Sequence, residues 1–329
     1  MKKVLVTGAG AVLGQGIIKS LRRANEPFFI IAADPSPLAT ALYWADESAI
    51  IPMASANDWS NEIEMLLDRA RPDIVFVGTD VELKRFAQKR KQWEKQFGTR
   101  IVVSDESVIE VADDKYSTAN FLKRNGLSHA ASALPENKED LQELVEHHGF
   151  PLIVKPRQGA RSVGVSLVNN RPQLKSALEN RRGLVVQQWA GPEDQEYTAG
   201  VICFDGAVQA QITLRRDLRD GNTYRAYASS YPDADDYVRR VASALSPFGP
   251  ANFQFRRGLD GEFRIFEINA RFSGTTPMRT MLGFNEIEMC VRHLTSNEKI
   301  TQPQISHGIV LRYLHEQFIP EKLIIRKHS

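Results

Sequence analysis

The sequence has 329 residues, which is the length of about two domains. Charged residues make up 25% of it and hydrophobic residues 42%, which argues against a disordered, collagen-like or coiled-coil chain. The formal net charge is only +2, so a general nucleic-acid-binding surface is not expected. The sequence contains no run of 18 apolar residues that could cross a membrane.

The two cysteines, Cys203 and Cys290, stand far apart and outside any metal-ligand spacing. This argues against a disulfide framework and against a structural zinc site. Isolated thiols suit a reducing compartment, so we predict a cytoplasmic protein. The apolar run near the N-terminus is broken by glycines and leads into Lys19, Arg22 and Arg23, which is not typical of a signal peptide.

Short apolar runs alternate with amphipathic stretches in the first third of the chain. Four such runs are typical of buried parallel strands, namely residues 4–7, 28–32, 74–77 and 101–103. Residues 13–23 and 61–69 lie between them and have helical spacing. We therefore predict a doubly wound α/β domain over residues 1–110.

A glycine-rich turn follows the first predicted strand, and Asp34 ends the second. Gly8, Gly10 and Gly14 in that turn are typical of a dinucleotide-binding fingerprint, in which the acid binds a ribose hydroxyl. The same glycines also suit tight packing of a strand against a helix. A nicotinamide site and a packing role both stay open at this point.

The pattern changes after residue 110. Helices are predicted at 114–124, 138–147 and 173–179, and strands at 152–155, 163–168 and 184–188. The final third contains four antiparallel-looking strands with Asp-Gly hairpin turns, at 197–204, 207–214, 251–257 and 263–268. We predict an α+β region in two further domains, 111–187 and 188–329.

A predicted strand ends in Lys155 and runs into residues 157–164, a loop rich in glycine and cations. A lysine delivered by a strand, beside backbone N–H groups that can fold over an anion, suits a triphosphate. An edge-strand charge with a hairpin connection is the plainer alternative. Residues 187–190 then leave a strand and offer backbone groups to an adenine edge, and Glu196 can accept both ribose hydroxyls.

Polar residues also alternate along two strands that a hairpin would pair. The alternation places Gln254, Glu267 and Asn269 on one face, with the phenylalanines and Ile268 on the other. Three oxygen ligands on one face suit Mg²⁺, although a solvent-facing polar side is the alternative. Arg271 follows two residues later and can neutralise charge on a transferred phosphoryl group.

These segments together resemble the ATP-grasp superfamily. The shared motifs are Asp114-Lys115, PLIVKPRxGxxSxGV at 151–165, the Glu196-Tyr197 pair, NFQF at 252–255 and EINARFSG at 267–274. The resemblance covers residues 1 to about 290 and is strongest to carbamoyl-phosphate-synthetase large-chain-like ligases, including the pyrrolysine-biosynthesis type. It departs from the family in having Gln187-Gln188 where an acid is common, Ala270 where proline is usual, and a longer linker at 191–195.

The resemblance implies a pre-ATP-grasp domain (1–110), a central and lid subdomain (111–187) and a C-terminal domain with the metal site (188–329). It implies ATP and Mg²⁺ as cofactors, with two ions and with Mn²⁺ able to substitute. The implied ATP contacts are Lys115, Lys155, Arg161, Ser162, Val163, Gly164, Gln187, Gln188, Trp189, Ala190 and Glu196. The implied metal ligands are Gln254, Glu267 and Asn269, and the implied catalytic residues are Arg271 and Lys155.

The predicted reaction is an ATP-dependent ligation through an acyl phosphate, in which a carboxylate is joined to an amine or a thiol and ADP and phosphate are released. The substrates would be small amino-acid-like or sugar-acid molecules, without nucleic acid or membrane partners, and a homodimer stays open. The rivals are an NAD(P)-dependent oxidoreductase and a nucleotide-binding protein without turnover.

Candidate substrate contacts are Thr79, Asp80 and Glu82, which follow the strand at 74–77, and Arg216 in a predicted loop at 215–219. Asp80 is equally suited to cap a helix, and the loop could be merely basic and exposed.

Overall fold

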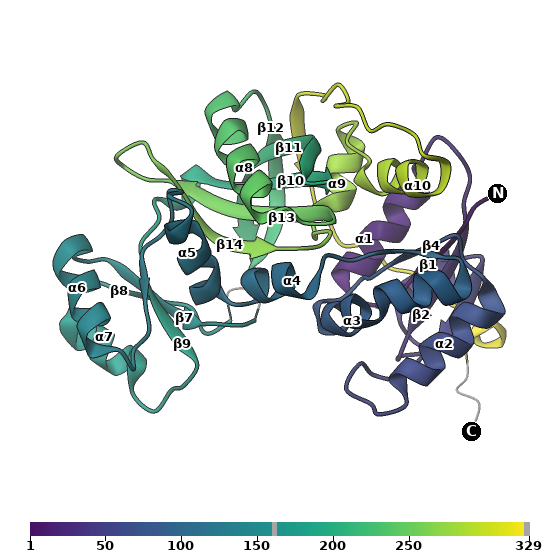
Figure 1. Cartoon of the computed structure of the whole chain (residues 1–329), viewed down its shortest axis with the longest axis horizontal. Helices are drawn as coiled ribbons and strands as arrows, with labels where there is room; N and C mark the ends of the chain where they lie inside the picture. Colours follow the sequence, from purple (N-terminus) through teal and green to yellow (C-terminus); the bar gives the residue numbers. More distant parts are fainter. Residues whose placement is uncertain (160–162, 326–329) are drawn as a thin grey trace.

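The computed structural model describes residues 1–159 and 163–325 and contains three β-sheets (Figure 1). The first sheet is parallel and has the order β3-β2-β1-β4-β5. Its strands are β1 (Lys3–Val6), β2 (Phe29–Asp34), β3 (Glu47–Ile50), β4 (Ile74–Phe76) and β5 (Arg100–Val102). Its helices are α1 (Val12–Leu21), α2 (Trp59–Ala70) and α3 (Asp80–Phe97), with a 3₁₀ turn η1 (Thr40–Trp44). The predicted doubly wound α/β architecture is confirmed.

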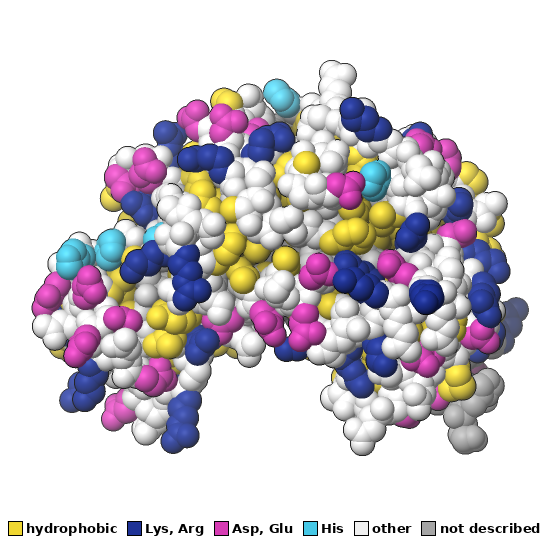
Figure 2. Space-filling model, in the orientation of Figure 1, with side chains coloured by type: hydrophobic (Ala, Val, Ile, Leu, Met, Phe, Trp, Pro, Cys, Tyr) yellow, Lys and Arg dark blue, Asp and Glu magenta, His cyan; other side chains and the backbone are white. Residues whose placement is uncertain are grey.

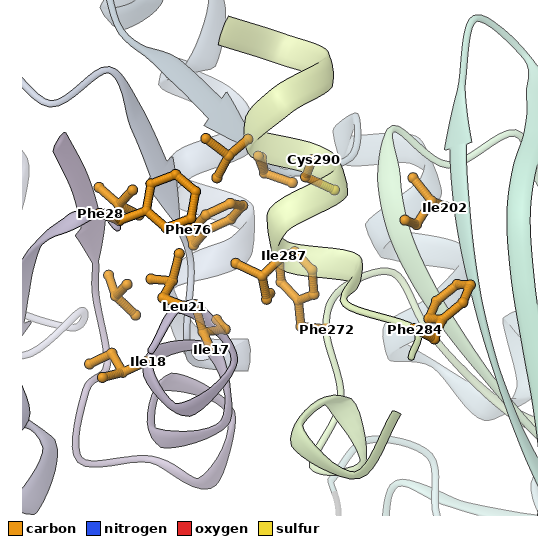
Figure 3. Close-up of a cluster of buried hydrophobic side chains, with 14 of the residues drawn as sticks. Ile17, Ile18, Leu21, Phe28, Phe76, Ile202, Phe272, Phe284, Ile287 and Cys290 are labelled. Carbon is orange, nitrogen blue, oxygen red and sulfur yellow. The ribbon is translucent and has the colours of Figure 1, made fainter. Parts of the chain in front are cut away.

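The two faces of this sheet bury different partners. On one face, Trp59, Phe86 and Trp93 of α2 and α3 pack together with ring centroids 5.2–6.0 Å apart. On the other face, Ile17 and Phe76 join a cluster with Phe272 and Ile287 from the far end of the chain (Figure 3). The N-terminal domain therefore shares one apolar core with the C-terminal part of the chain.

The middle of the chain begins with α4 (Glu106–Asp113) and α5 (Lys115–Arg124). Asp114 separates these helices, and its carboxylate caps α5 by accepting the N–H groups of Tyr116 and Ser117. A four-stranded antiparallel sheet follows, in the order β6-β9-β7-β8. Its elements are β6 (Ser132–Ala133), α6 (Lys138–His148), β7 (Leu152–Pro156), β8 (Ser166–Val168), α7 (Arg171–Leu178) and β9 (Leu184–Gln188).

The third sheet has six antiparallel strands in the order β14-β13-β10-β11-β12-β15. After the 3₁₀ turn η2 (Glu193–Gln195), its strands are β10 (Glu196–Phe204), β11 (Ala207–Arg219), β12 (Asn222–Ala228), β13 (Gly249–Arg257), β14 (Phe263–Asn269) and β15 (Gly308–Leu311). The remaining helices are α8 (Pro232–Leu245), α9 (Thr276–Met281), α10 (Glu286–Ser296) and the 3₁₀ turn η3 (Glu321–Leu323).

The predicted basic loop at 215–219 is wrong, because β11 continues through it to Arg219. The cause is cross-strand pairing with β12, a strand that the sequence analysis did not predict. Arg215 lies opposite Tyr227, and its guanidinium carbon is 3.7 Å from the centre of the tyrosine ring. The turn of the β11–β12 hairpin lies directly after the predicted loop, at Asp220 and Gly221, and both residues have positive φ.

The outer surface is hollowed between the lobe that carries α6 and α7 and the lobe that carries α2 and α3 (Figure 2). Basic and acidic side chains are interspersed on the face shown, as expected for a chain of small net charge. In the described ranges, the structure contains no helix whose length and apolar character would let it cross a membrane.

Candidate active site

A cleft of about 420 Å³ is lined by strand residues of the second and third sheets and by the starts of α1 and α3 in the N-terminal domain. It receives most of the residues that the sequence analysis selected. Those lining it are Thr79, Asp80, Lys115, Lys155, Val163, Gln187, Gln188, Trp189, Ala190, Glu196, Arg216, Gln254, Glu267 and Arg271. Segments that are far apart in the sequence thus meet at one site.

Lys155 lies near the end of β7 and is buried, with its side chain directed at the cleft. Its Nζ donates to Oε1 of Gln187 at 2.6 Å and to the carbonyl oxygen of Phe266 at 3.2 Å. Burial lowers the pKa of Lys155 to about 7, while the nearby Glu267 carboxylate raises it. The lysine therefore has neutral hydrogen-bond partners and is available to an incoming anion.

The segment predicted to meet adenine divides into two parts. Gln187 is buried in β9 between β6 and β7, so its backbone belongs to the sheet and its side chain orients Lys155. The N–H of Gln188 donates to the carbonyl of Ala131 at 2.7 Å. Among the described residues, the backbone groups of Trp189 and Ala190 have no hydrogen-bond partner. These two residues are the part of the segment 187–190 that could meet an adenine edge.

Glu196 starts β10 and is buried between two arginines. Oε1 accepts from Arg216 at 2.6 and 3.0 Å, and Oε2 accepts from Arg256 at 2.6 and 2.8 Å. Arg216 is therefore a buried strand residue and not part of an exposed loop. The predicted ribose contact of Glu196 stays a prediction, and a ribose would have to share these oxygens with the arginines.

The hairpin of β13 and β14 brings the predicted metal-binding residues together. Gln254 lies directly opposite Glu267, and Gln254 Nε2 and Asn269 Nδ2 are 3.4 and 3.1 Å from Glu267 Oε1. A β-bulge interrupts the pairing after Gln254 and leaves Phe266 as the extra residue. Phe266 therefore lines the cleft beside Glu267, which corrects the prediction that the phenylalanines all face the other way.

The chemistry of this face suits a magnesium ion with Glu267 as its anionic ligand. Its Oε2 has no hydrogen-bond partner among the described residues. Gln254 and Asn269 direct their amide oxygens at Arg216 (2.7 Å) and Arg271 (2.9 Å), so both amides have to turn to ligate a metal. In the part of the chain that the structure describes, no cluster of three or more Asp, Glu, His or Cys could hold a metal. A magnesium ion at this face would need phosphate and water to complete its ligands.

Arg271 joins the hairpin to the N-terminal domain. Its Nε and Nη2 donate to the two carboxylate oxygens of Asp80 at 2.6 and 3.2 Å. Asp80 is the first residue of α3, and the N-cap position is Thr79, so the alternative that Asp80 caps the helix is wrong. Asp80 thus orients the arginine predicted to face the phosphoryl group.

The remaining predicted ATP contacts lie around residues 157–164. Lys115 is buried, and its Nζ donates to the carbonyl of Gly159 at 2.9 Å. Val163 lines the cleft, whereas Gly164 lies outside the lining and its carbonyl accepts from Arg181 at 2.7 Å. Arg161 and Ser162 lie outside the described residues, so their roles stay predictions.

Two acids of the N-terminal domain serve the fold. Asp34 accepts the N–H of Gly10 at 2.7 Å and the N–H of Ser36 at 2.9 Å, so both carboxylate oxygens hold their own backbone. Glu82, a predicted substrate contact, is buried outside the cleft lining and accepts from Thr7 at 2.8 Å and from Trp59 at 3.3 Å. Burial raises the pKa of Glu82 to about 7. The predicted substrate role of Glu82 is wrong because its position on α3 turns it inward.

The cleft also contains polar residues that the sequence analysis missed. Asn252 and Arg256 share the alternation of Gln254 along β13, so extending that pattern by one step each way would have found both. Arg312 reaches the cleft from the segment after β15, and no sequence pattern marked it.

Three family models match consecutive parts of the chain. A model of the PylC-like N-terminal domain matches residues 4–102, and a RimK-like ATP-grasp domain matches residues 112–242. A model of the ATP-grasp in the biosynthetic pathway with Ter operon matches residues 184–317. The two ATP-grasp models together run from residue 112 to residue 317, which is more than half of the chain.

Two relatives align over most of this chain. A formate-dependent phosphoribosylglycinamide formyltransferase of Bacteroides fragilis is 26% identical over 310 residues, which cover 89% of this chain and 76% of the relative. The arginine-specific carbamoyl phosphate synthase large chain of Halalkalibacterium halodurans is 24% identical over 303 residues, which cover 84% of this chain. The chain spans only 28% of that large chain's length.

Solved structures share the fold. N5-carboxyaminoimidazole synthetase from Staphylococcus aureus, complexed with ADP, superimposes with a TM-score of 0.72 at 16% identity, covering 92% of this chain and 80% of that one. An L-amino acid ligase from Bacillus licheniformis has a TM-score of 0.68 at 17% identity, covering 90% and 74%. At these identities the likeness concerns the fold, and the reaction has to be argued from the site.

Proposed function

The chain belongs to the ATP-grasp superfamily of ligases, and from that premise we propose that it is an ATP- and Mg²⁺-dependent ligase that joins a small carboxylic acid to an amine or a thiol. The γ-phosphoryl group of ATP passes to the carboxylate, giving an acyl phosphate and ADP. The amine or thiol then attacks the acyl carbon and phosphate leaves. The proton that the amine or thiol loses passes to the departing phosphate or to water, and no covalent bond to the protein forms.

The observation that carries the proposal is the meeting of Lys155 with the β13–β14 hairpin. The Nζ of Lys155 contacts the carbonyl oxygen of Phe266, the residue before Glu267. A buried lysine and a carboxylate thus stand on two different sheets and face the same space, as the proposed binding of phosphate and metal requires. Phosphoryl transfer depends mainly on this kind of positioning and charge neutralisation.

Each end of the nucleotide has a proposed place. The backbone of Trp189 and Ala190 binds the adenine edge, and Lys115 and Lys155 bind phosphate oxygens. Glu267 would hold Mg²⁺, and Gln254 and Asn269 would turn their amide oxygens toward the ion. The bound ion would neutralise charge on the phosphates. Glu267 is the only carboxylate on this face of the hairpin among the described residues, so the second predicted ion would depend mainly on phosphate oxygens.

The substrate is expected beyond the phosphates, toward the N-terminal domain. Arg271, Thr79 and Asp80 line that part of the cleft. Arg271 is proposed to neutralise charge on the transferred phosphoryl group. The cytoplasmic location and the homodimer stay predictions.

The test is an ADP-release assay with MgATP and a panel of small acids, each combined with ammonia, amino acids or cysteine. At least one pair should release ADP only when both acid and amine or thiol are present. Lys155→Ala should abolish that release of ADP. The control is Lys175→Ala, which removes a lysine from an exposed position and should leave the release unchanged. A protein that binds MgATP tightly yet releases no ADP with any pair would support the nucleotide-binding alternative instead.

The oxidoreductase alternative is not favoured. Both carboxylate oxygens of Asp34, the acid it requires for a ribose, accept hydrogen bonds from the backbone of its own domain. Equilibrium binding of NAD(H) and NADP(H), measured beside MgATP, separates the two functions directly.

A further inference from the structure

The charges that line the cleft are unevenly matched. In the described parts of the chain, six cationic side chains line it, namely Lys115, Lys155, Arg216, Arg256, Arg271 and Arg312. Three carboxylates line it as well, and these are Asp80, Glu196 and Glu267. Anionic ligands would match this excess of positive charge, and the partner of each cation can be identified in turn.

Five of the six cationic side chains already have an anionic partner, either observed or proposed. Arg216 and Arg256 share the Glu196 carboxylate, and Arg271 is paired with Asp80. Lys115 and Lys155 are the lysines proposed above to bind ATP phosphates. Only Arg312 is then left without a carboxylate or phosphate partner among the described residues.

Arg312 is held at the end of the cleft that faces the N-terminal domain. Its backbone N–H donates to the carbonyl of Tyr224 at 2.9 Å, and its Nη2 donates to the carbonyl of Gly274. A methyl group placed on Gly274 would lie 3.3 Å from Val12, so this turn touches the start of α1. The guanidinium therefore sits close to the substrate end and makes only neutral contacts there.

The first turn of α1 adds to the positive character of this end. Ala11, Val12 and Leu13 line the cleft, and α1 has neither a side-chain cap nor an acidic residue in its first turn. The uncapped N–H groups and the helix dipole both favour an anion. Burial lowers the pKa of Arg312, as expected for a guanidinium partly removed from water without a counter-charge.

The distance to the reacting group limits the size of the ligand. Arg271 Nη1 donates to the carbonyl of Phe272 at 2.9 Å, and Arg312 donates to the carbonyl two residues later. Two residues of chain span at most about 7 Å, and each hydrogen bond adds about 3 Å. The two guanidinium groups therefore lie within reach of the two ends of one small molecule.

We propose that the acid substrate carries a second anionic group, a carboxylate or a phosphate, which binds to Arg312 beside the first turn of α1. The inference rests on the proposed function, because it takes the first carboxylate to react near Arg271. The substrate class is thus a small dianionic acid. A simple monocarboxylic acid would leave the charge of Arg312 unmatched.

The test measures binding of matched pairs to the enzyme saturated with MgADP, by calorimetry. The pairs are butyrate with succinate, valerate with glutarate, and glycerol with glycerol 3-phosphate. In at least one pair the ligand with the additional anionic group should bind about tenfold more tightly, which is typical of one charge-assisted contact. The pair that shows the preference distinguishes a carboxylate from a phosphate.

Variants assign the preference to one side chain. Arg312→Gln should remove the preference without changing MgADP affinity, whereas Arg312→Lys should keep most of it. Arg182→Gln, an exposed arginine outside the cleft lining, is the matched control. A preference that is absent from every pair, or that survives in Arg312→Gln, overturns the inference and leaves the proposed function standing. Failure of the wild-type protein to bind MgADP instead overturns the proposed function, and the inference with it.

Discussion

The acid of the glycine motif after β1, Asp34, and the acid of the β13–β14 hairpin, Glu267, have their carboxylate oxygens used differently, although each belongs to a motif typical of a ligand site. In the glycine turn, a methyl group on Gly14 would meet the carbonyl oxygen of Gly8 at 2.2 Å, so the glycine allows close packing of α1 against the turn that precedes it. The acid that completes the motif, Asp34, binds the backbone of that turn. In the hairpin, Glu267 keeps one carboxylate oxygen without a partner and lines the cleft.

The difference teaches that a motif forms a ligand site only when its polar atoms remain available after the chain has folded. Asp34 is buried, and both of its oxygens are used by N–H groups within two residues of it or in the adjoining turn. Glu267 lies on the edge strand β14, which pairs with β13, and its Oε2 keeps no hydrogen-bond partner among the described residues, which leaves that oxygen for a ligand.

The largest effect is expected from Glu267→Gln. Removing the one carboxylate on this face should lower turnover about a thousandfold at millimolar Mg²⁺, because the metal contributes several kcal/mol to stabilising the transition state. Binding of ATP through its base and ribose should persist. The control is Glu262→Gln, which removes an exposed carboxylate from the same hairpin. Near-normal turnover of Glu267→Gln would make the hairpin structural.

A smaller loss is expected from Lys155→Ala. The variant should bind MgADP about a hundredfold more weakly, because a buried cation that faces the phosphates is removed. Its circular dichroism spectrum should be unchanged, since the lysine donates only to Gln187 and to one carbonyl. Lys175→Ala serves as the matched surface control. Unchanged affinity in a folded Lys155→Ala protein would contradict the assignment.

Asp34→Ala tests the other half of the contrast. Two backbone N–H groups lose their acceptor, which should lower the free energy of unfolding by about 2 kcal/mol in urea titrations. ATP turnover below the unfolding transition should change by less than about twofold, since Asp34 lies outside the cleft lining. Asp34→Asn keeps one acceptor and should lose less. Micromolar NAD(H) binding that Asp34→Ala abolishes would restore the dehydrogenase hypothesis.

The smallest effect is a pH dependence. Burial lowers the pKa of Lys155 to about 7 in the ligand-free protein, and phosphates bind its protonated form. MgADP affinity should therefore be highest below that pKa and should fall several-fold between pH 7 and pH 9. Lys155→Arg keeps its charge throughout this range and should show a flatter profile. Parallel profiles for the two proteins would mean that Lys155 still carries its positive charge at pH 9.

Much of the site follows from local sequence patterns. Alternation along two strands predicts that Gln254 and Glu267 share one face. A strand that ends in a lysine before a glycine-rich loop predicts that Lys155 faces the ligand site. Both inferences need only the period of a β-strand and short-range order along the chain. For the same reason the doubly wound sheet could be predicted from its apolar runs.

The errors arise where distant segments meet. Glu82 was expected in the cleft, but its direction depends on how α3 packs against Thr7 and Trp59. Phe266 enters the cleft because of a bulge, which a strict alternation cannot show. Arg312 is placed by β15 pairing with β12 and by a turn 38 residues earlier in the chain. These positions depend on tertiary contacts that no local pattern encodes.

The apolar core shared by α1 and α10 also has a consequence for synthesis on the ribosome. The strands of the first sheet are complete once Val102 has emerged, but Ile287, Cys290 and Val291, which cover one face of that domain, follow about 190 residues later. At a synthesis rate of about 5–20 residues per second, that face of the nascent domain stays exposed to solvent for roughly 10–40 s. We predict that a fragment ending at residue 110 binds a hydrophobic dye strongly and associates with chaperones, whereas the full chain does neither. A soluble, dye-free fragment would show that the first domain folds without its late partner.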